Sequence, residues 1–103
     1  MSKRQNPLAT FRCRLYVAGA AINSAHAVAN LQAICRAQLL NRLKFEVELV
    51  DVLADPERAL EDGVIMTPTL IKLSPLPVRR IVGSLSDTAT VLHALGIRAP
   101  FVT

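Results

Sequence analysis

Two alternating segments flank a long stretch without helix breakers, and this order constrains the fold more than any other feature. Residues 11–17 place apolar side chains on one face, which are Phe11, Cys13, Leu15 and Val17. Residues 45–52 alternate in the same way at their start, so both segments have the pattern of half-buried strands. Residues 24–42 contain neither Pro nor Gly, which predicts a helix. A strand, a helix and a strand form a βαβ unit with two parallel strands.

The central segment predicts an amphipathic helix with a defined start. Asn23 and Ser24 are both suitable N-cap residues. Apolar residues recur at helical spacing and are expected to form its buried stripe, which comprises Val28, Leu31, Cys35 and Leu39.

The second half of the chain supports two interpretations. In the first, Asp55 and Pro56 open a short helix that stops at Gly63, strands follow at 70–73 and 78–82, and Ser86 or Asp87 caps a last helix that ends at Gly96. The resulting order is βαβαββα. In the second, Thr67-Pro68 and Ser74-Pro75 start helices, and the β-branched residues near 88–91 form a strand. Local preferences that conflict in this way often mark a functional region, but the ordinary error of local patterns explains the conflict as well, and from the residues alone we favour that explanation.

The length and composition predict one α/β domain. The 103 residues suffice for one core, and 51% of them are apolar. We expect one domain over 1–103, with flexible ends at 1–9 and 98–103. No apolar run reaches the length of a membrane helix, no secretory signal opens the chain, and two cysteines make no disulfide framework. These features predict a cytoplasmic protein that does not associate with membranes.

The charged and aromatic residues do not form the pattern of a nucleic-acid-binding protein. The net charge is +4, but the basic residues are scattered, and seven of the eight acids lie between Glu46 and Asp62. Four aromatic residues, without basic residues interleaved, offer little for base stacking. We therefore expect protein partners and no nucleic acid.

The residue types that catalysis or metal binding needs are not grouped in this sequence. His26 and His93 have no second His or Cys at metal-ligand spacing, and both are expected on the surface. The four glycines stand apart, so there is no phosphate-binding loop. The sequence predicts no enzyme, no cofactor and no metal.

The predicted order resembles the thioredoxin fold, in which the residue before a late strand is a cis proline, here Pro68. Redox chemistry in that fold needs Cys-x-x-Cys after the first strand. Ala20-Ala21-Ile22-Asn23-Ser24 stands there instead, and Cys13 and Cys35 are expected in the core. A thiol-linked enzyme would have only the Ser24 hydroxyl at this position, so we do not favour it.

Four stretches, which lie between positions 11 and 96, carry a more specific pattern. They are Leu15-Tyr16-Val17-Ala18-Gly19 with Asn23-Ser24, Val50-Asp51-Val52-Leu53 with Pro56 and Glu61-Asp62, Thr67-Pro68-Thr69-Leu70 through Lys72, and Pro77-Val78-Arg79-Arg80-Ile81-Val82-Gly83 with Leu85-Ser86. This pattern resembles the KaiB family, small partner proteins of the circadian clock ATPase KaiC. The chain is identified as a member, a divergent paralogue or homologue.

The resemblance implies a non-enzymatic, metamorphic adaptor. KaiB proteins occupy a tetrameric ground state, βαββααβ, and a rarer monomeric thioredoxin-like form, βαβαββα. The second form binds KaiC and affects the access of KaiA and of output histidine kinases. The residues that the resemblance implies for partner binding are Lys72, Arg79, Arg80, Asp51, Tyr16 and His26. The residues expected at the fold switch are Gly83, Ser84, Leu85, Ser86, Asp87 and Pro68.

The chain departs from the family pattern at several positions. Ala20 follows Gly19 where an asparagine is usual, Ala54 and Gly63 replace lysines that help to hold KaiC, and His26 replaces an arginine. These departures are the reason for expecting a divergent member. The alternative interpretation is a redox-inactive thioredoxin-like sensor module of the clock histidine kinase type, which would remain monomeric.

The position of Arg79 and Arg80 in a predicted strand also indicates an interface, independently of the resemblance. They are consecutive in a predicted strand and point to opposite faces of the sheet. One of them is therefore expected to meet the core or a partner, since burying an arginine without an acceptor is costly. The alternative is an arginine on an edge strand whose charged end reaches solvent.

Overall fold

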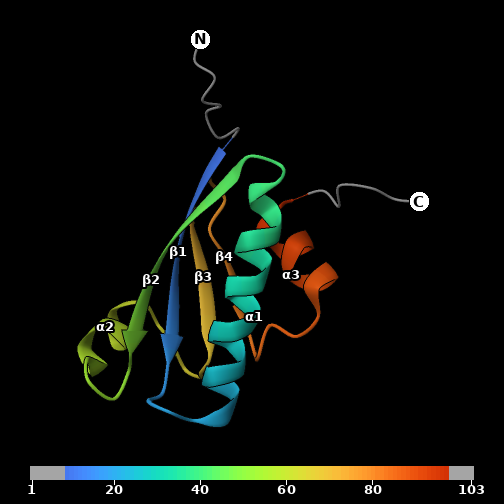
Figure 1. Cartoon of the computed structure of the whole chain (residues 1–103). Helices are drawn as coiled ribbons and strands as arrows, with labels where there is room; N and C mark the ends of the chain where they lie inside the picture. Colours follow the sequence, from blue (N-terminus) through green and yellow to red (C-terminus); the bar gives the residue numbers. More distant parts are fainter. Residues whose placement is uncertain (1–8, 98–103) are drawn as a thin grey trace.

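The computed structural model describes residues 9–97, and they form four strands and three helices (Figure 1). In chain order these are β1 (Ala9–Val17), α1 (Ile22–Leu39), β2 (Leu43–Asp51), α2 (Pro56–Glu61), β3 (Thr69–Ser74), β4 (Arg79–Val82) and α3 (Thr88–Leu95). This βαβαββα order confirms the first interpretation of the sequence. Residue 9, predicted as part of a flexible end, belongs to β1, whereas 1–8 and 98–103 lie outside the described residues.

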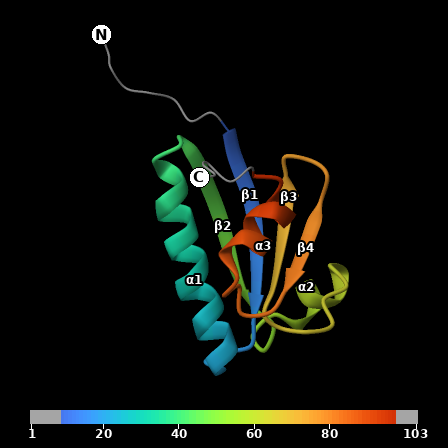
Figure 2. The same ribbon diagram turned by 90° about the vertical axis from the view of Figure 1, so that its right-hand side faces the viewer.

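The strands form one sheet in the order β2-β1-β3-β4. β1 and β2 are parallel, as the βαβ pattern requires, while β3 is antiparallel to β1 and β4 is antiparallel to β3. α1 and α3 cover one face of the sheet, and α2 lies against the other (Figures 1 and 2). The sheet therefore has its two edges at β2 and β4.

The two sheet faces carry cores of different size. The larger core joins the apolar face of β1 to α1 and α3 and includes Leu15, Leu31 and Leu95. The smaller core lies under α2 and consists of Tyr16, Val50, Ala59 and Ile71. Alternation along β1 decides which core a side chain joins, because neighbouring residues of a strand point to opposite faces.

Helix α1 differs from its prediction at its start and in its buried stripe. It begins at Ile22, one residue after an Ala21 N-cap that makes no side-chain bond, and the Ser24 hydroxyl accepts instead from the Ala18 amide at 3.1 Å. The residues that are buried are Ser24, Ala27, Leu31, Ile34 and Gln38.

Two members of the predicted stripe are only half-buried, and one is exposed. Val28 and Cys35 lie at the margin of the core, and Leu39 is 58% exposed. Of the predicted stripe only Leu31 is buried, because the true stripe includes Ser24, Ala27 and Gln38, which a search for large apolar residues does not select.

The helix ends predicted for the second half are mostly confirmed. Asp87 caps α3 by accepting from the Thr90 amide at 3.2 Å, and Gly96 ends that helix with a φ of 81°. Pro56 begins α2, but the Asp55 carboxylate makes no capping bond. The Thr67–Pro68 peptide is cis, as the thioredoxin-like order predicts.

None of the helices in the described part of the chain has both the length and the hydropathy that crossing a membrane requires.

Candidate functional site

The loops at one end of the sheet form the candidate interaction surface. β1, β2 and β4 finish there and β3 begins there, so four connections meet at the lower end of the molecule in Figure 1. We call this surface the loop end, and it comprises residues 18–22, 52–55, 63–68 and 83–87. Function in small α/β domains commonly resides in loops that a rigid sheet positions.

Asp51 fixes two of these loops to each other. Its Oδ1 accepts from the Gly19 amide at 3.0 Å and from the Leu53 amide at 2.9 Å. Gly19 has a φ of +54°, and a Cβ at this position would lie 3.1 Å from the Leu53 Cδ1 atom. The predicted partner-binding carboxylate of Asp51 is therefore already used within the chain, where it shapes the loop end.

Large apolar side chains are exposed around the loop end. Ile65 is 92% exposed, and Leu53 and Ile22 are more than two-thirds exposed. Met66 and Val82 are more than half exposed. Exposed apolar side chains that gather at one place indicate a protein interaction surface. The sequence pattern did not identify them, because the exposure of an apolar residue in a connection depends on tertiary packing.

His26 and three departures from the family pattern also lie at this end. His26 is exposed on the second turn of α1, in agreement with the prediction for the imidazole. Ala20, Ala54 and Gly63 are all exposed in loop-end connections. The positions at which this chain departs from the pattern are therefore concentrated on one surface.

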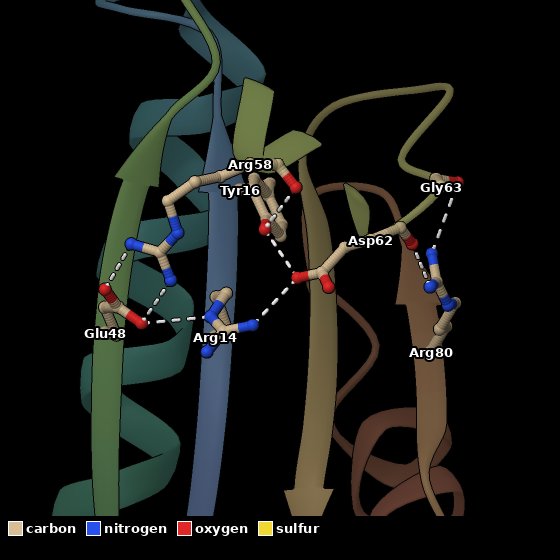
Figure 3. A network of polar contacts seen from close by, with 7 residues as sticks. All are labelled: Arg14, Tyr16, Glu48, Arg58, Asp62, Gly63 and Arg80. Atoms are coloured by element: carbon tan, nitrogen blue, oxygen red, sulfur yellow. Dashed lines mark hydrogen bonds and ion pairs between the residues drawn. The ribbon is translucent and has the colours of Figure 1, made fainter. Parts of the chain in front are cut away.

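A network of polar side chains lies on the α2 face of the sheet (Figure 3). The Arg14 guanidinium bridges Glu48 at 2.9 Å and Asp62 at 2.8 Å. The Arg58 guanidinium holds the same Glu48 carboxylate with two bonds, of 2.5 and 2.9 Å. The Tyr16 hydroxyl, at the buried end of the network, lies 2.5 Å from Asp62 Oδ2 and 3.0 Å from the Arg58 carbonyl oxygen. The network fixes α2 to β1 and β2.

The contacts in this network shift the pKa values of its acids. Hydrogen bonds from Arg58 and then Arg14 lower the pKa of Glu48 from 4.5 to about 2. The Tyr16 hydroxyl, followed by Arg14, lowers the pKa of Asp62. Burial, followed by the Asp62 carboxylate, raises the pKa of Tyr16. Each shift favours the ionised acids and the neutral phenol that the geometry shows.

Stability is expected to decrease in acid because of these acids. A carboxyl group whose pKa is lowered by folding stabilises the folded state above its ordinary pKa, and this contribution is lost as the pH falls through the folded value. For Glu48 the loss falls between pH 4.5 and about 2. Urea unfolding across this range should show a smaller pH dependence for Glu48→Gln than for the parent. Glu57→Gln, which removes an exposed acid outside the network, should behave like the parent. An unchanged pH dependence in Glu48→Gln would contradict the assignment.

Two of the other predicted partner-binding residues are buried. Tyr16 is fully buried, and Lys72 is 3% exposed with its Nζ bonded to the Leu95 carbonyl oxygen at 3.3 Å. In this fold neither side chain is accessible to a partner. Both were assigned to partner binding from the family resemblance, and their position in a strand did not indicate that an element covers them.

Arg79 and Arg80 occupy opposite faces of β4, as alternation predicts. Both side chains are exposed on the edge strand β4, so neither meets the core, and this placement agrees with the alternative of an arginine at a sheet edge. Contact of either arginine with a partner stays a prediction. The Arg80 guanidinium donates to the carbonyl oxygens of Asp62 and Gly63, at the end of α2. Arg79 faces α3.

The comparisons with known proteins identify the family. A model of the KaiB domain matches residues 14–97 of this chain. The circadian clock protein KaiB3 of Synechocystis sp. is 44% identical over 84 residues, which are 82% of this chain and 80% of the relative. The circadian clock oscillator protein KaiB of Synechococcus elongatus is 41% identical over 92 residues, with 89% of this chain and 88% of the relative covered.

The chain belongs to the KaiB family.

Solved structures of other proteins share the fold of this KaiB-family chain. The N-terminal domain of Synechococcus elongatus SasA superposes with a TM-score of 0.70 at 18% identity, covering 99% of this chain and 98% of that domain. Mitochondrial thioredoxin 3 of Saccharomyces cerevisiae gives a TM-score of 0.65 at 19% identity, covering 90% and 81% of the two chains. At these identities the likeness establishes a thioredoxin-like fold and nothing further.

The segment predicted to switch fold in this KaiB-family chain has an unusual backbone. Gly83 has a φ of 119° and Leu85 a φ of 63°, although Leu85 is buried in the larger core. The Gly83 amide donates to the Pro68 carbonyl oxygen at 2.9 Å, and the Ser84 carbonyl oxygen accepts from the Asn30 side chain at 2.8 Å. A leucine in the left-handed region costs on the order of 1 kcal/mol or more, and only the surrounding contacts hold it there.

Proposed function

We propose that this protein is a non-enzymatic adaptor that binds a KaiC-type ATPase. The observation that carries the proposal is that the KaiB-domain match covers nearly the whole described domain, including every loop of the loop end. The exposed apolar side chains of that end, with Ile65 the most exposed, supply a surface that a partner can bury. Binding would modulate the ATPase and phosphorylation cycle of KaiC in the cytoplasm, and the access of KaiA or of output kinases to it.

The state of the cysteines supports an adaptor over a thiol enzyme. Burial raises the pKa of Cys13 to about 12, and burial also raises the pKa of Cys35. Nucleophilic attack by sulfur needs the thiolate form of cysteine. Burial disfavours that form at both Cys13 and Cys35. The start of α1, where a thioredoxin-like enzyme carries its reactive cysteine, has Ala21 and Ile22 instead.

The proposal includes a second fold of the same chain. A tetrameric ground state, a dimer of dimers, would exchange with the thioredoxin-like monomer described above. The backbone at Gly83 and Leu85 supports this, because two positive φ values, one of them at a leucine, are strained and depend on the contacts of this particular fold. A partner that binds only the monomeric form draws the population toward it.

A sensor module of the clock histidine kinase type is the second candidate, and the likeness to the SasA domain favours it. The sensor module is the weaker candidate, because the chain is 41–44% identical to KaiB proteins and only 18% identical to the SasA domain. The two candidates differ in solution: the sensor module stays monomeric, whereas the adaptor forms a tetramer.

The loop end can be tested with a pair of matched substitutions. Ile65→Glu is expected to weaken binding to a KaiC-type ATPase by about tenfold or more, because a charge replaces a side chain that the partner buries. Leu40→Glu is the control, since Leu40 is 88% exposed at the far end of α1. Binding is measured by biolayer interferometry on both variants after circular dichroism has shown that each is folded.

Equal affinities of the two variants would contradict the loop end as the binding surface. The proposed adaptor function is contradicted if the unaltered chain forms no complex with any KaiC-type ATPase.

A further inference from the structure

A pocket of about 380 Å³ lies between the β3–β4 hairpin and the C-terminal end of α3. It is on the same sheet face as α3 and away from the loop end. The residues that line it are Lys72, Pro77, Arg79, Arg80, His93, Ala94 and Gly96. No acid is among them, so the pocket is lined by basic and uncharged groups only.

Lys72 supplies the deepest charge of the pocket. It is 3% exposed, and its Nζ bonds to the Leu95 carbonyl oxygen at 3.3 Å. Within residues 9–97 no carboxylate lies within ion-pair distance of this ammonium group. Buried lysines are usually paired, because removing a charge from water is costly. One backbone acceptor leaves two of the three Nζ donors for another group.

Arg79 adds a second positive charge directly beside the first. It is the cross-strand partner of Lys72 in the β3–β4 ladder, and like charges that face each other across a ladder are destabilising. Among the described residues Arg79 makes no ion pair. Arg80 contributes less, because its guanidinium is engaged by the carbonyl oxygens of Asp62 and Gly63 on the opposite face. His93 adds an imidazole from α3.

From this arrangement we propose that the pocket binds a small oxyanion of the phosphate class. A phosphate group carries between one and two negative charges at neutral pH and offers several acceptor oxygens. The Lys72 ammonium and the Arg79 guanidinium, which holds phosphate with two parallel bonds, match that chemistry. The carbonyl groups at the end of α3 would repel an anion, but the Lys72 ammonium lies against the last of them. The proposal does not depend on the proposed binding of KaiC.

The test is a titration of the unaltered chain with inorganic phosphate at constant ionic strength, followed by ¹H–¹⁵N NMR. Saturable shifts are expected for the amides of residues 72–74, 76, 78, 79 and 93–96, with sodium chloride at equal ionic strength giving none. Acetate, with a single charge, should bind more weakly than phosphate. Tighter binding of acetate, or the absence of saturable shifts with phosphate, would overturn the proposal.

Two substitutions locate the site. Arg79→Gln should weaken phosphate binding by about tenfold, because a charge-assisted bidentate contact is lost. Arg36→Gln removes the same charge from an exposed position on α1 and should leave the affinity unchanged. Lys72→Met should also weaken binding, and it is expected to fold because an apolar chain of similar volume replaces a buried cation. Should Lys72→Met not fold, Arg79→Gln decides: unchanged affinity in that variant contradicts the site.

Discussion

Tyr16→Ala is expected to lower the free energy of unfolding by about 3 to 5 kcal/mol, the range for removing a buried aromatic ring. Tyr16 is fully buried and packs with Val50, Ala59 and Ile71 in the smaller core. Its hydroxyl also holds Asp62, so the substitution removes both the packing and one attachment of α2. A domain of this size is stable by only about 5 to 15 kcal/mol, and the loss is therefore severe. Urea unfolding followed by circular dichroism measures it.

Tyr16→Phe separates the two contributions. It keeps the ring and removes the hydroxyl, so the expected loss is about 1 to 3 kcal/mol, which is the cost of leaving a partly buried carboxylate without one of its donors. If Tyr16→Phe is as stable as the parent, the hydroxyl does not contribute and the pKa of Asp62 should be unaffected as well. If Tyr16→Ala costs less than 1 kcal/mol, the smaller core as described is wrong.

Gly83→Ala is expected to destabilise the thioredoxin-like form by about 1 to 3 kcal/mol, which is roughly a 5- to 150-fold change in its equilibrium constant. Gly83 has a φ of 119°, which residues with a Cβ rarely adopt. No atom lies within 4 Å of the position of an added Cβ, so the cost is in the backbone and not in crowding. The proposed second fold would be favoured if it does not need this conformation. Populations are measured as separate sets of NMR peaks and by size-exclusion chromatography.

Ser84→Ala is the matched control for this experiment. It alters the neighbouring side chain but keeps the Ser84 carbonyl oxygen that accepts from Asn30. Its populations should equal those of the parent. The same populations in Gly83→Ala and Ser84→Ala would contradict a role for the Gly83 conformation in the balance between folds.

The sequence predicted the first half of the fold and the order of the second. Alternation in β1 and β2 and the uninterrupted α1 have only one simple interpretation, and the ladder between Phe11 and Phe45 confirms it. The second half had two interpretations, because Thr-Pro and Ser-Pro open either a helix or a strand. Tertiary contacts decide between them: in the βαβαββα arrangement Leu70 and Leu85 are both buried in the larger core.

The site was less predictable than the fold. Asp51 and His26 were found at the loop end, but nothing in the sequence indicated that the Asp51 carboxylate is occupied by two loop amides. Lys72 was expected on a surface, whereas α3 covers it. Burial of a polar strand residue depends on which helix crosses its face, and this is a property of topology that local pattern does not contain.

The association of this chain with a KaiC-type ATPase tests the proposed function most directly. The two proteins are mixed, and size-exclusion chromatography with light scattering follows the complex over time. The account predicts a stable complex whose rate of formation reaches a plateau as the ATPase concentration rises, since a change of fold precedes binding. It also predicts a tetramer for the chain alone. A chain that remains monomeric and never co-elutes with the ATPase would contradict it.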